Sequence, residues 1–430
     1  MNHQLPHFDR LRLKNVRCFR EAEIPLDTQV TVVIGGNGSG KTTLIEALAS
    51  LTFGEDEGLS TFPFRRGTTA GAISLYEAGR ERPVAKWTAG AKAISRRRLP
   101  ESRYIFAFGR YRRVFSPNAE EVSASTAPDP AELLDELAHR AGERRTRTLN
   151  HPDNNLLRDL ARYLVALDFG RSSDPRLGNI WEKLNASLPG LEGSLTGIRM
   201  EEGQFGRVPR VVRNGLALDL SELSDGYQAL LVVTFDLMLR YAYLFFHLEN
   251  PLEGQAVVAI DEVDLHLHPR WQRTVVAQLT ELFPNTQFVL TTHSPIVVQG
   301  AIDRGMSVVT LREKHGVVAP RRLGPRLKNG LRGAEVGSLL LDDYLFGVES
   351  RYSTEYSAIE DRVDELQARV SKGTATAEDH RELSQHLAKL EELVTREDER
   401  RADGSTVAQM VRLQAAFVKD LLAELERAKR

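Results

Sequence analysis

One segment of the chain has the residues of a loop that binds phosphate groups. It reads Gly35-Gly36-Asn37-Gly38-Ser39-Gly40-Lys41-Thr42, and Thr43 follows. Glycines let backbone N–H groups turn inward around phosphate oxygens at a helix N-terminus, where the helix dipole favours negative charge. Lys41 would reach the β and γ oxygens, and the Thr42 hydroxyl would ligate Mg²⁺. A glycine-rich turn without a nucleotide is the alternative. We predict a nucleotide site formed by Gly35, Asn37, Gly38, Ser39, Gly40, Lys41, Thr42 and Thr43.

Two carboxylates follow a buried apolar run later in the chain. The run 257–260 leads directly into Asp261 and Glu262. At the C-terminal end of a strand, Asp261 would hold Mg²⁺, largely through water, and Glu262 would orient or polarise the attacking water. A loop that merely begins after a strand is the alternative, but Lys41 upstream favours a metal site at Asp261 and a catalytic role for Glu262.

A second anion-binding surface is predicted around Ser224. The segment Leu223-Ser224-Asp225-Gly226-Tyr227-Gln228 resembles the signature motif of ABC-type ATPases, with Asp225 in place of its second-position glycine. The Ser224 hydroxyl, the backbone at Gly226 and the following helix N-terminus could together bind an anion. An ordinary turn with a helix N-cap is the alternative.

Histidines follow the two later apolar runs. His293 lies in Thr291-Thr292-His293-Ser294-Pro295, which resembles the switch-histidine loop, so we predict a catalytic residue that senses the γ-phosphate. His266 and His268 have a spacing found in metal sites, but no third ligand is recognisable. We therefore favour a loop over a metal site for residues 263–269, and the resemblance to ABC-type ATPases implies that this loop is a dimer contact.

The elements around these motifs are predicted to alternate between strand and helix. Buried β-branched runs predict strands, and apolar side chains spaced three and four residues apart predict helices. The expected strands are 11–16, 22–26, 30–34, 256–260 and 287–292, and the expected helices are 42–51, 229–248 and 270–282. This order predicts an α/β fold with a mixed, mainly parallel sheet and flanking helices.

The chain is predicted to have two parts. Residues 1–350 would form the main domain, with a helical insertion at about 52–200 that includes a helix over 130–145. Residues 351–430 form a charged helical region. Apolar stripes over 359–370, 383–394 and 407–425 predict three helices in a small bundle, and Thr376 with Asp379 resembles a capping box.

Composition limits the class of protein and its partners. Cys18 is the single cysteine, so no intrachain disulfide can form, and we expect a packed side chain. No apolar run is long enough to span a bilayer and the first ten residues lack a signal-like stretch, so we expect a cytoplasmic protein without a membrane partner.

Basic residues cluster strongly although the formal net charge is only −2. Residues 80–113 hold many arginines and lysines, including Arg96, Arg97 and Arg98, against only two glutamates. Tyr104 and Tyr111 are interleaved with them, as in segments that contact nucleic acids. The segment is therefore a candidate contact for DNA or RNA. A solvated loop or a lid over the nucleotide is the equal alternative.

Together the motifs resemble the ABC-type ATPases of the SMC, RecF and OLD group over most of residues 1–350. Within that group the sequence is similar to compact ATPases such as the ATPase subunit of Septu antiphage systems. The resemblance implies an ABC-type phosphate-loop head, ATP and Mg²⁺ as cofactors, and hydrolysis to ADP and phosphate. It also implies that Arg17, in the opening strand and turn, lies beside the nucleotide. Two features depart from the pattern: no glutamine lies between Gln29 and Gln204, and long heptad arms are missing.

The resemblance leaves several functions open. The first is an ATP-gated homodimer, or higher homo-oligomer, in antiphage defence or DNA transactions. In it Ser224 of one subunit would contact ATP held by the other. Such a dimer would act through a nuclease effector, with the HNH type among the candidates. The alternatives are the ATPase subunit of a membrane transporter and an ATP-binding scaffold with little turnover.

Overall fold

A six-stranded sheet carries the glycine loop, the Asp261–Glu262 pair and the histidine loop at the ends of its strands. The computed structural model describes residues 8–51, 65–90, 94–97, 104–110, 156–191, 193–203, 206–245, 247–314, 316–334, 336–342, 345–346, 354–371 and 374–401. The sheet has the order β14-β13-β3-β12-β11-β7. Its strands are β3 (Val30–Gly35), β7 (Tyr104–Phe108), β11 (Ala256–Ile260), β12 (Thr286–Thr291), β13 (Ser307–Lys314) and β14 (Val317–Arg322).

Parallel pairing dominates this sheet. β7, β11, β12, β3 and β13 pair in parallel, and only β14 runs antiparallel to its neighbour β13. All five residues of β11 and all six of β12 are buried, as expected for strands covered on both faces. The predicted α/β fold with a mixed, mainly parallel sheet is therefore confirmed.

Two hydrophobic cores lie on the two faces of the sheet, because side chains alternate along each strand. Val33 belongs to one core, and Val32 and Ile34 belong to the other. The first core is closed by α1 (Lys41–Ser50) and an antiparallel sheet of order β2-β1-β4-β5-β6. The strands of that sheet are β1 (Arg10–Val16), β2 (Phe19–Pro25), β4 (Ala70–Tyr76), β5 (Ala85–Gly90) and β6 (Ile94–Arg97).

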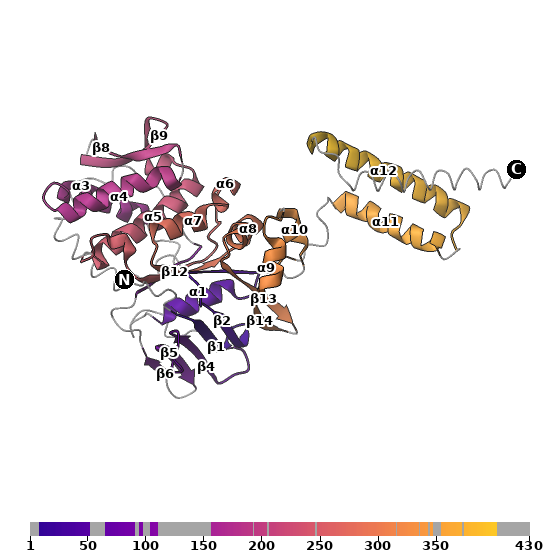
Figure 1. The fold of residues 1–430 in the computed structure, drawn as a ribbon, viewed down its shortest axis with the longest axis horizontal. Helices are drawn as coiled ribbons and strands as arrows, with labels where there is room; N and C mark the ends of the chain where they lie inside the picture. The colour runs from indigo at the N-terminus through magenta and orange to yellow at the C-terminus, as the bar shows by residue number, and fades with distance from the viewer. Residues whose placement is uncertain are drawn as a thin grey trace. The chain divides into compact units, whose positions relative to one another are not determined.

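Helices close the second core, together with a small sheet of order β10-β9-β8 (Figure 1). The strands of this sheet are β8 (Leu195–Gly203), β9 (Gly206–Arg213) and β10 (Leu216–Asp219). The helices are α3 (Leu156–Gly170), α4 (Pro175–Leu191), α5 (Asp225–Leu244), α6 (Pro269–Gln272), α7 (Val275–Leu282), α8 (Pro295–Asp303), α9 (Pro325–Leu331) and α10 (Val336–Leu341). Short 3₁₀ turns lie at Leu220–Glu222 and Pro251–Glu253.

The interval 52–200 differs from the helical insertion that the sequence predicted. Among the described residues, β4 to β7 lie within it and β8 begins in it, and β7 pairs with β11 in the main sheet. Only α3 and α4 are helical there within the part of the chain described, and the helix predicted over 130–145 lies outside that part. The helical prediction was wrong for these strands: β4 pairs with β1 and β7 with β11, partners far away in sequence, and β5 and β6 extend the sheet from β4.

The helix predicted over 270–282 is divided in two. α6 ends at Gln272, and α7 begins after Thr274, its N-cap residue. Among the described residues no helix combines the length and the apolar character needed to cross a membrane.

The chain divides into two compact units, Met1–Phe346 and Gly347–Arg430, a boundary four residues before the expected 350. In the second unit, α11 (Thr354–Ser371) and α12 (Ala377–Arg401) pack together and bury most of the two apolar stripes that the sequence predicted: Ile359, Val363 and Leu366 on α11, and Leu383, Leu387 and Leu390 on α12. The capping box at the start of α12 is confirmed. Thr376 N donates to Asp379 Oδ2 at 2.7 Å, and Asp379 N donates to Thr376 Oγ1 at 3.2 Å. The bond from Thr376 N, and a second that Thr376 Oγ1 donates to the same carboxylate oxygen at 2.7 Å, hold the pKa of Asp379 below its ordinary value. The stripe over 407–425 lies outside the described residues.

Candidate functional site

The glycine loop joins the end of β3 to the start of α1, as the sequence predicted. Gly38 and Gly40 have φ angles of 78° and 96°, in the left-handed region that side chains disfavour. A Cβ atom on Gly40 would also lie 2.5 Å from Cys18 Sγ. Glycine is therefore required at position 40 by both backbone conformation and space, and half-buried Cys18 packs against the loop.

Lys41 lies buried inside the curve of the loop. Its Nζ donates to the carbonyl oxygens of Gly35 and Gly36 at 2.8 and 3.0 Å. Burial lowers the pKa of Lys41, and three nearby carboxylates oppose that shift in part, those of Asp261, Glu262 and Asp264. An ammonium group held among carbonyl oxygens is already placed for a phosphate oxygen to replace them.

Ser39 provides a direct test of whether the loop fits a phosphate. Its hydroxyl oxygen is buried, and no hydrogen-bond partner is found for it among the described residues. A buried polar atom without a partner is costly, so a ligand that supplies one would be stabilised there. The loop therefore fits a bound anion.

Thr42 meets Asp261 although the two residues are 219 positions apart. Thr42 Oγ1 donates to Asp261 Oδ2 at 2.7 Å, because parallel strands β3, β12 and β11 bring their carboxyl ends to one edge. Asp261 is almost fully buried, at 1% exposure. A hydroxyl and a carboxylate at this distance are the donor set that Mg²⁺ takes beside phosphates. These residues therefore fit the predicted metal site.

Thr291 fixes both acidic residues that follow β11. Its hydroxyl donates to Asp261 Oδ1 at 2.5 Å and accepts from Glu262 N at 2.8 Å. Glu262 has a φ of 49°, an uncommon conformation for a residue with a side chain. The Thr291 hydroxyl, fully buried on β12, therefore holds the backbone turn that presents the half-buried Glu262 side chain.

His293 follows β12 with its side chain exposed. The residues on either side of it are anchored: Thr292 Oγ1 donates to Asp264 Oδ1, and Ser294 Oγ accepts from Ile296 N and Val297 N at the start of α8. The histidine loop is therefore tied at both ends while His293 itself faces solvent.

Arg17 lies beside the glycine loop, and its side chain reaches α1. Its guanidinium pairs with Glu46 and contacts Thr43 Oγ1 at 3.4 Å. Glu46 is buried, and burial raises its pKa while Arg17 opposes the shift. Arg17 has a φ of 44°, an uncommon conformation for a residue with a side chain, in the turn between β1 and β2.

Ser224 is the N-cap residue of α5, and its side chain is exposed and makes no capping hydrogen bond. A Cβ atom on Gly226 would overlap the carbonyl oxygen of His266, so the signature-like segment packs closely on the loop 263–268. His268 Nδ1 accepts from Arg270 N at 3.3 Å and caps α6. No hydrogen bond or ion pair within the described part of the chain joins Ser224 or Gly226 to residues 35–43.

Residues 30–299 match a family described as "AAA domain, putative AbiEii toxin, Type IV TA system". The chain belongs to this family. The match covers the glycine loop, the Asp261–Glu262 pair, Ser224 and His293. It is a family of ATPases, which agrees with the predicted resemblance.

This AAA-domain chain is also similar to curated ATPases. It is 42% identical over 99 residues to "Retron Vc95 probable ATPase" of Vibrio cholerae, covering 23% of this chain and 19% of that protein. It is 30% identical over 178 residues to "Septu protein PtuA" of Bacillus mycoides, covering 41% of this chain and 23% of that protein. The matches thus span about a fifth of each relative's length.

A solved SMC head bound to the C-winged helix domain of ScpA aligns with a TM-score of 0.46 at 14% identity, covering 75% of this chain and 99% of that chain.

Sequence reasoning did not anticipate Gln272. Its Nε2 donates to the Leu267 carbonyl at 2.8 Å, and its Oε1 accepts from Ser294 Oγ at 2.7 Å. Gln272 therefore links the loop after Asp261–Glu262 to the histidine loop of this AAA-domain chain. Glutamine at the end of a short helix has no local pattern that marks such a role. Thr291 belongs to the histidine motif, and its position at the end of a buried strand is the sequence signal for its role beside Asp261 and Glu262.

The basic segment 80–113 lies largely outside what the structure describes. Arg98 and Tyr111 fall among undescribed residues, and the side chains of Arg96 and Arg97 on β6 are likewise outside the description. Arg80 pairs with Glu77 at 3.0 Å. The nucleic-acid contact predicted for this segment stays a prediction.

Proposed function

We propose that the chain binds ATP with Mg²⁺ at the loop 35–43 and hydrolyses it. The observation that carries this proposal is the hydrogen bond between Thr42 and Asp261, which joins the two halves of a metal site at the phosphate loop. The buried, unpartnered Ser39 hydroxyl and the buried Lys41 ammonium support it.

Each residue has a separate task in this proposal. Lys41 and the loop N–H groups bind the phosphates. Thr42 and Asp261 would hold Mg²⁺, which supplies charge neutralisation of the phosphate oxygens when bound. Glu262, held by Thr291, orients the attacking water, and His293 contacts the γ-phosphate. Arg17 adds a positive charge beside the loop.

The exposed N-terminus of α5 supports a site completed by a second copy of the chain. Ser224 leaves its hydroxyl uncommitted, and the helix N-terminus behind it favours an anion. Within one chain the described residues show no bond between Ser224 and the phosphate loop. We therefore assign Ser224 and Gly226 to the γ-phosphate of ATP held by the partner, in an ATP-gated homodimer.

Mixing two inactive variants tests the shared site. Lys41→Ala would destroy the phosphate loop, and Ser224→Arg would block the signature surface. In a symmetric dimer with two composite sites, each mixed dimer keeps one intact site, so the mixture should regain about a quarter of wild-type ATP turnover. Turnover that stays at zero in a verified mixed dimer, or that survives Ser224→Arg alone, would contradict composite sites.

The names of the relatives support a role in antiphage defence or DNA transactions, since one is a retron ATPase and one a Septu protein. We propose that the closed dimer controls a partner nuclease, with the HNH type among the candidates. Co-purification with the product of the neighbouring gene, with and without ATP, tests this. ATP-dependent capture of a nuclease is expected. A neighbour that binds equally without nucleotide and shows no cleavage would contradict the proposed control.

A further inference from the structure

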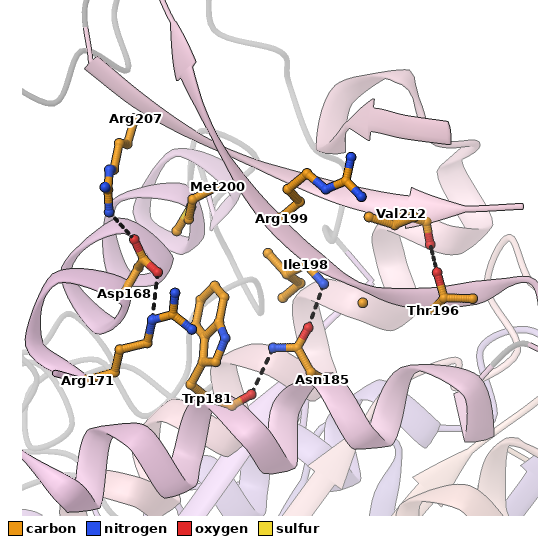
Figure 2. A pocket seen from close by; sticks show the side chains of 11 residues that line it. Asp168, Arg171, Trp181, Asn185, Thr196, Ile198, Arg199, Met200, Arg207 and Val212 are labelled. Atoms are coloured by element: carbon orange, nitrogen blue, oxygen red, sulfur yellow. Dashed lines mark hydrogen bonds and ion pairs between the residues drawn. The ribbon is translucent and has the colours of Figure 1, made fainter. Parts of the chain in front are cut away.

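A hollow of about 540 Å³ lies between two helices and a β-hairpin, on elements that carry none of the motifs described above. Figure 2 shows its lining, with α3 and α4 on one side and β8 and β9 on the other. Its volume is in the range of pockets that hold small ligands. The lining holds three arginines and one carboxylate, Arg171, Arg199, Arg207 and Asp168, and therefore carries a surplus of positive charge.

The carboxylate of Asp168 fixes two of the arginines at the wall of this hollow. Arg171 Nε pairs with Asp168 Oδ1 at 2.9 Å, and Arg207 Nη1 pairs with Asp168 Oδ2 at 2.6 Å (Figure 2). The Asp168 side chain is only 1% exposed, whereas those of Arg171 and Arg207 are 43% and 40% exposed. One buried carboxylate therefore holds two guanidinium groups that keep part of their surface for a ligand. Planar guanidinium forks match phosphate oxygens well.

Arg199 adds a positive charge to the lining. Its side chain is exposed, and it has no ion pair or hydrogen bond within the described residues. Arg207 Nε also lies 3.2 Å from Glu202 Oε1, but the Glu202 side chain is 77% exposed. Water screens this ion pair, so Glu202 neutralises little of the charge on Arg207. An anion in the hollow would therefore meet charge that the protein leaves uncompensated.

Two aromatic rings accompany the guanidinium groups. Arg171 lies 4.9 Å from the ring centre of Trp181, and Arg207 lies 5.1 Å from that of Phe169. Phe169 is 49% exposed and is one of two large hydrophobic side chains exposed among the described residues. An exposed ring beside arginines is the combination that stacks a nucleic-acid base while the arginines bind phosphate.

Asn185 keeps the walls together, which favours a preformed pocket. Its Oδ1 accepts from Ile198 N at 2.6 Å, and its Nδ2 donates to the Trp181 carbonyl at 2.9 Å (Figure 2). A Cβ atom on Gly197 would lie 3.1 Å from Asn185 Oδ1, so the strand approaches α4 closely there. β8 and α4 are thus joined at fixed spacing, and the lining does not depend on a ligand to assemble.

We propose that this hollow binds a nucleoside phosphate, with its phosphate on Arg171 and Arg207 and its base reaching the exposed ring of Phe169, which packs on Arg207 beside the lining residues. The unit comes either from a single-stranded nucleic acid or from a free nucleotide. The site shares no lining residue with the phosphate loop.

Binding is measured with full-length protein carrying Lys41→Ala, which silences the phosphate loop. One arm titrates a fluorescein-labelled single-stranded oligonucleotide, and the other titrates AMP by calorimetry. Binding in the first arm identifies a strand, and binding in the second alone identifies a free nucleotide. Absence of binding in both arms overturns the proposal.

Variants locate the binding. Phe169→Ala should weaken affinity about tenfold, since stacking on one ring is of that size. Arg207→Gln should weaken it by about the same factor, since it removes a charge-assisted hydrogen bond to the phosphate. Arg199→Gln should reduce the salt dependence of strand binding by about one ion. The control is Arg210→Gln on the same hairpin, because Arg210 pairs with Glu201 and Asp219 and does not line the hollow. Thermal melting checks that Arg207→Gln folds. The assignment would be overturned if the folded variants bound with wild-type affinity. It would also be overturned if Arg210→Gln lost as much affinity as Arg207→Gln.

Discussion

Replacing Thr291 with valine removes the hydroxyl that joins β12 to both acidic residues of the site. Valine preserves the shape of the side chain, so the change acts through two hydrogen bonds. The bond to Asp261 Oδ1 is 2.5 Å long and the bond from Glu262 N is 2.8 Å long. Thr291 and Asp261 are both almost fully buried, so water cannot readily replace the lost partner.

The expected cost follows from those two bonds. A hydrogen bond to a charged group contributes about 1.5–3 kcal/mol, and a buried N–H left without a partner costs about 1–3 kcal/mol. Because Glu262 is only half-buried, the lower part of the second range applies. We expect Thr291→Val to lower the free energy of unfolding by about 2–4 kcal/mol.

Catalysis should suffer as well, because Glu262 loses the bond that holds its strained turn. A misplacement on the order of 1 Å can cost about 10²-fold in rate, so turnover should fall by about ten- to a hundredfold. ATP affinity should change little, since Lys41 and the loop are untouched.

Urea unfolding and steady-state ATP turnover measure the two effects. The matched control is Thr234→Val on α5, where an equally buried hydroxyl donates to the Leu230 carbonyl at 2.9 Å. Thr234→Val should lower the free energy of unfolding by about 1 kcal/mol and leave ATP turnover unchanged. If Thr291→Val behaved like Thr234→Val in both assays, the reasoning on Thr291 would be refuted.

Three further predictions concern the same site. Burial lowers the pKa of Lys41 below its ordinary 10.5, so the charged form costs folding stability at neutral pH, and that cost shrinks as pH rises toward 10.5. Lys41→Met should therefore raise the nucleotide-free unfolding free energy at pH 7 by more than at pH 10; a lower stability at pH 7 would contradict this. Gln272→Leu should reduce turnover about tenfold at unchanged ATP affinity, whereas Gln278→Leu on α7 should not; equal turnovers would contradict the link between the two loops. Gly226→Ala should lower the melting temperature because its Cβ overlaps the His266 carbonyl oxygen, and an unchanged melting curve would contradict the close packing seen there.

The positions of the glycine loop after β3 and of Asp261 and Glu262 after β11 could be predicted because their signals are local. A buried β-branched run, a glycine loop and a helix with apolar spacing follow one another within about twenty residues, and each has its own pattern. The capping box at Thr376 and Asp379 is equally local, and its two hydrogen bonds are present.

Pairing between distant segments could not be predicted. β7 lies at the edge of the sheet beside β11, where Phe108 O accepts from Asp261 N at 2.8 Å, and nothing near Phe108 encodes that partner. The same holds for Gln272, whose two partners lie in different loops. Hydrophobic alternation indicates which face of a strand is buried, but it does not indicate which strand lies alongside.

ATP turnover and ATP binding, measured together on wild type and Glu262→Gln, test the central claim most directly. We predict that the wild-type protein hydrolyses ATP, and that Glu262→Gln binds ATP with similar affinity while turnover falls about 10²-fold or more. Lys41→Ala should lose binding itself. Wild-type protein that does not bind ATP, or a Glu262→Gln variant that turns over at the wild-type rate, would contradict the account.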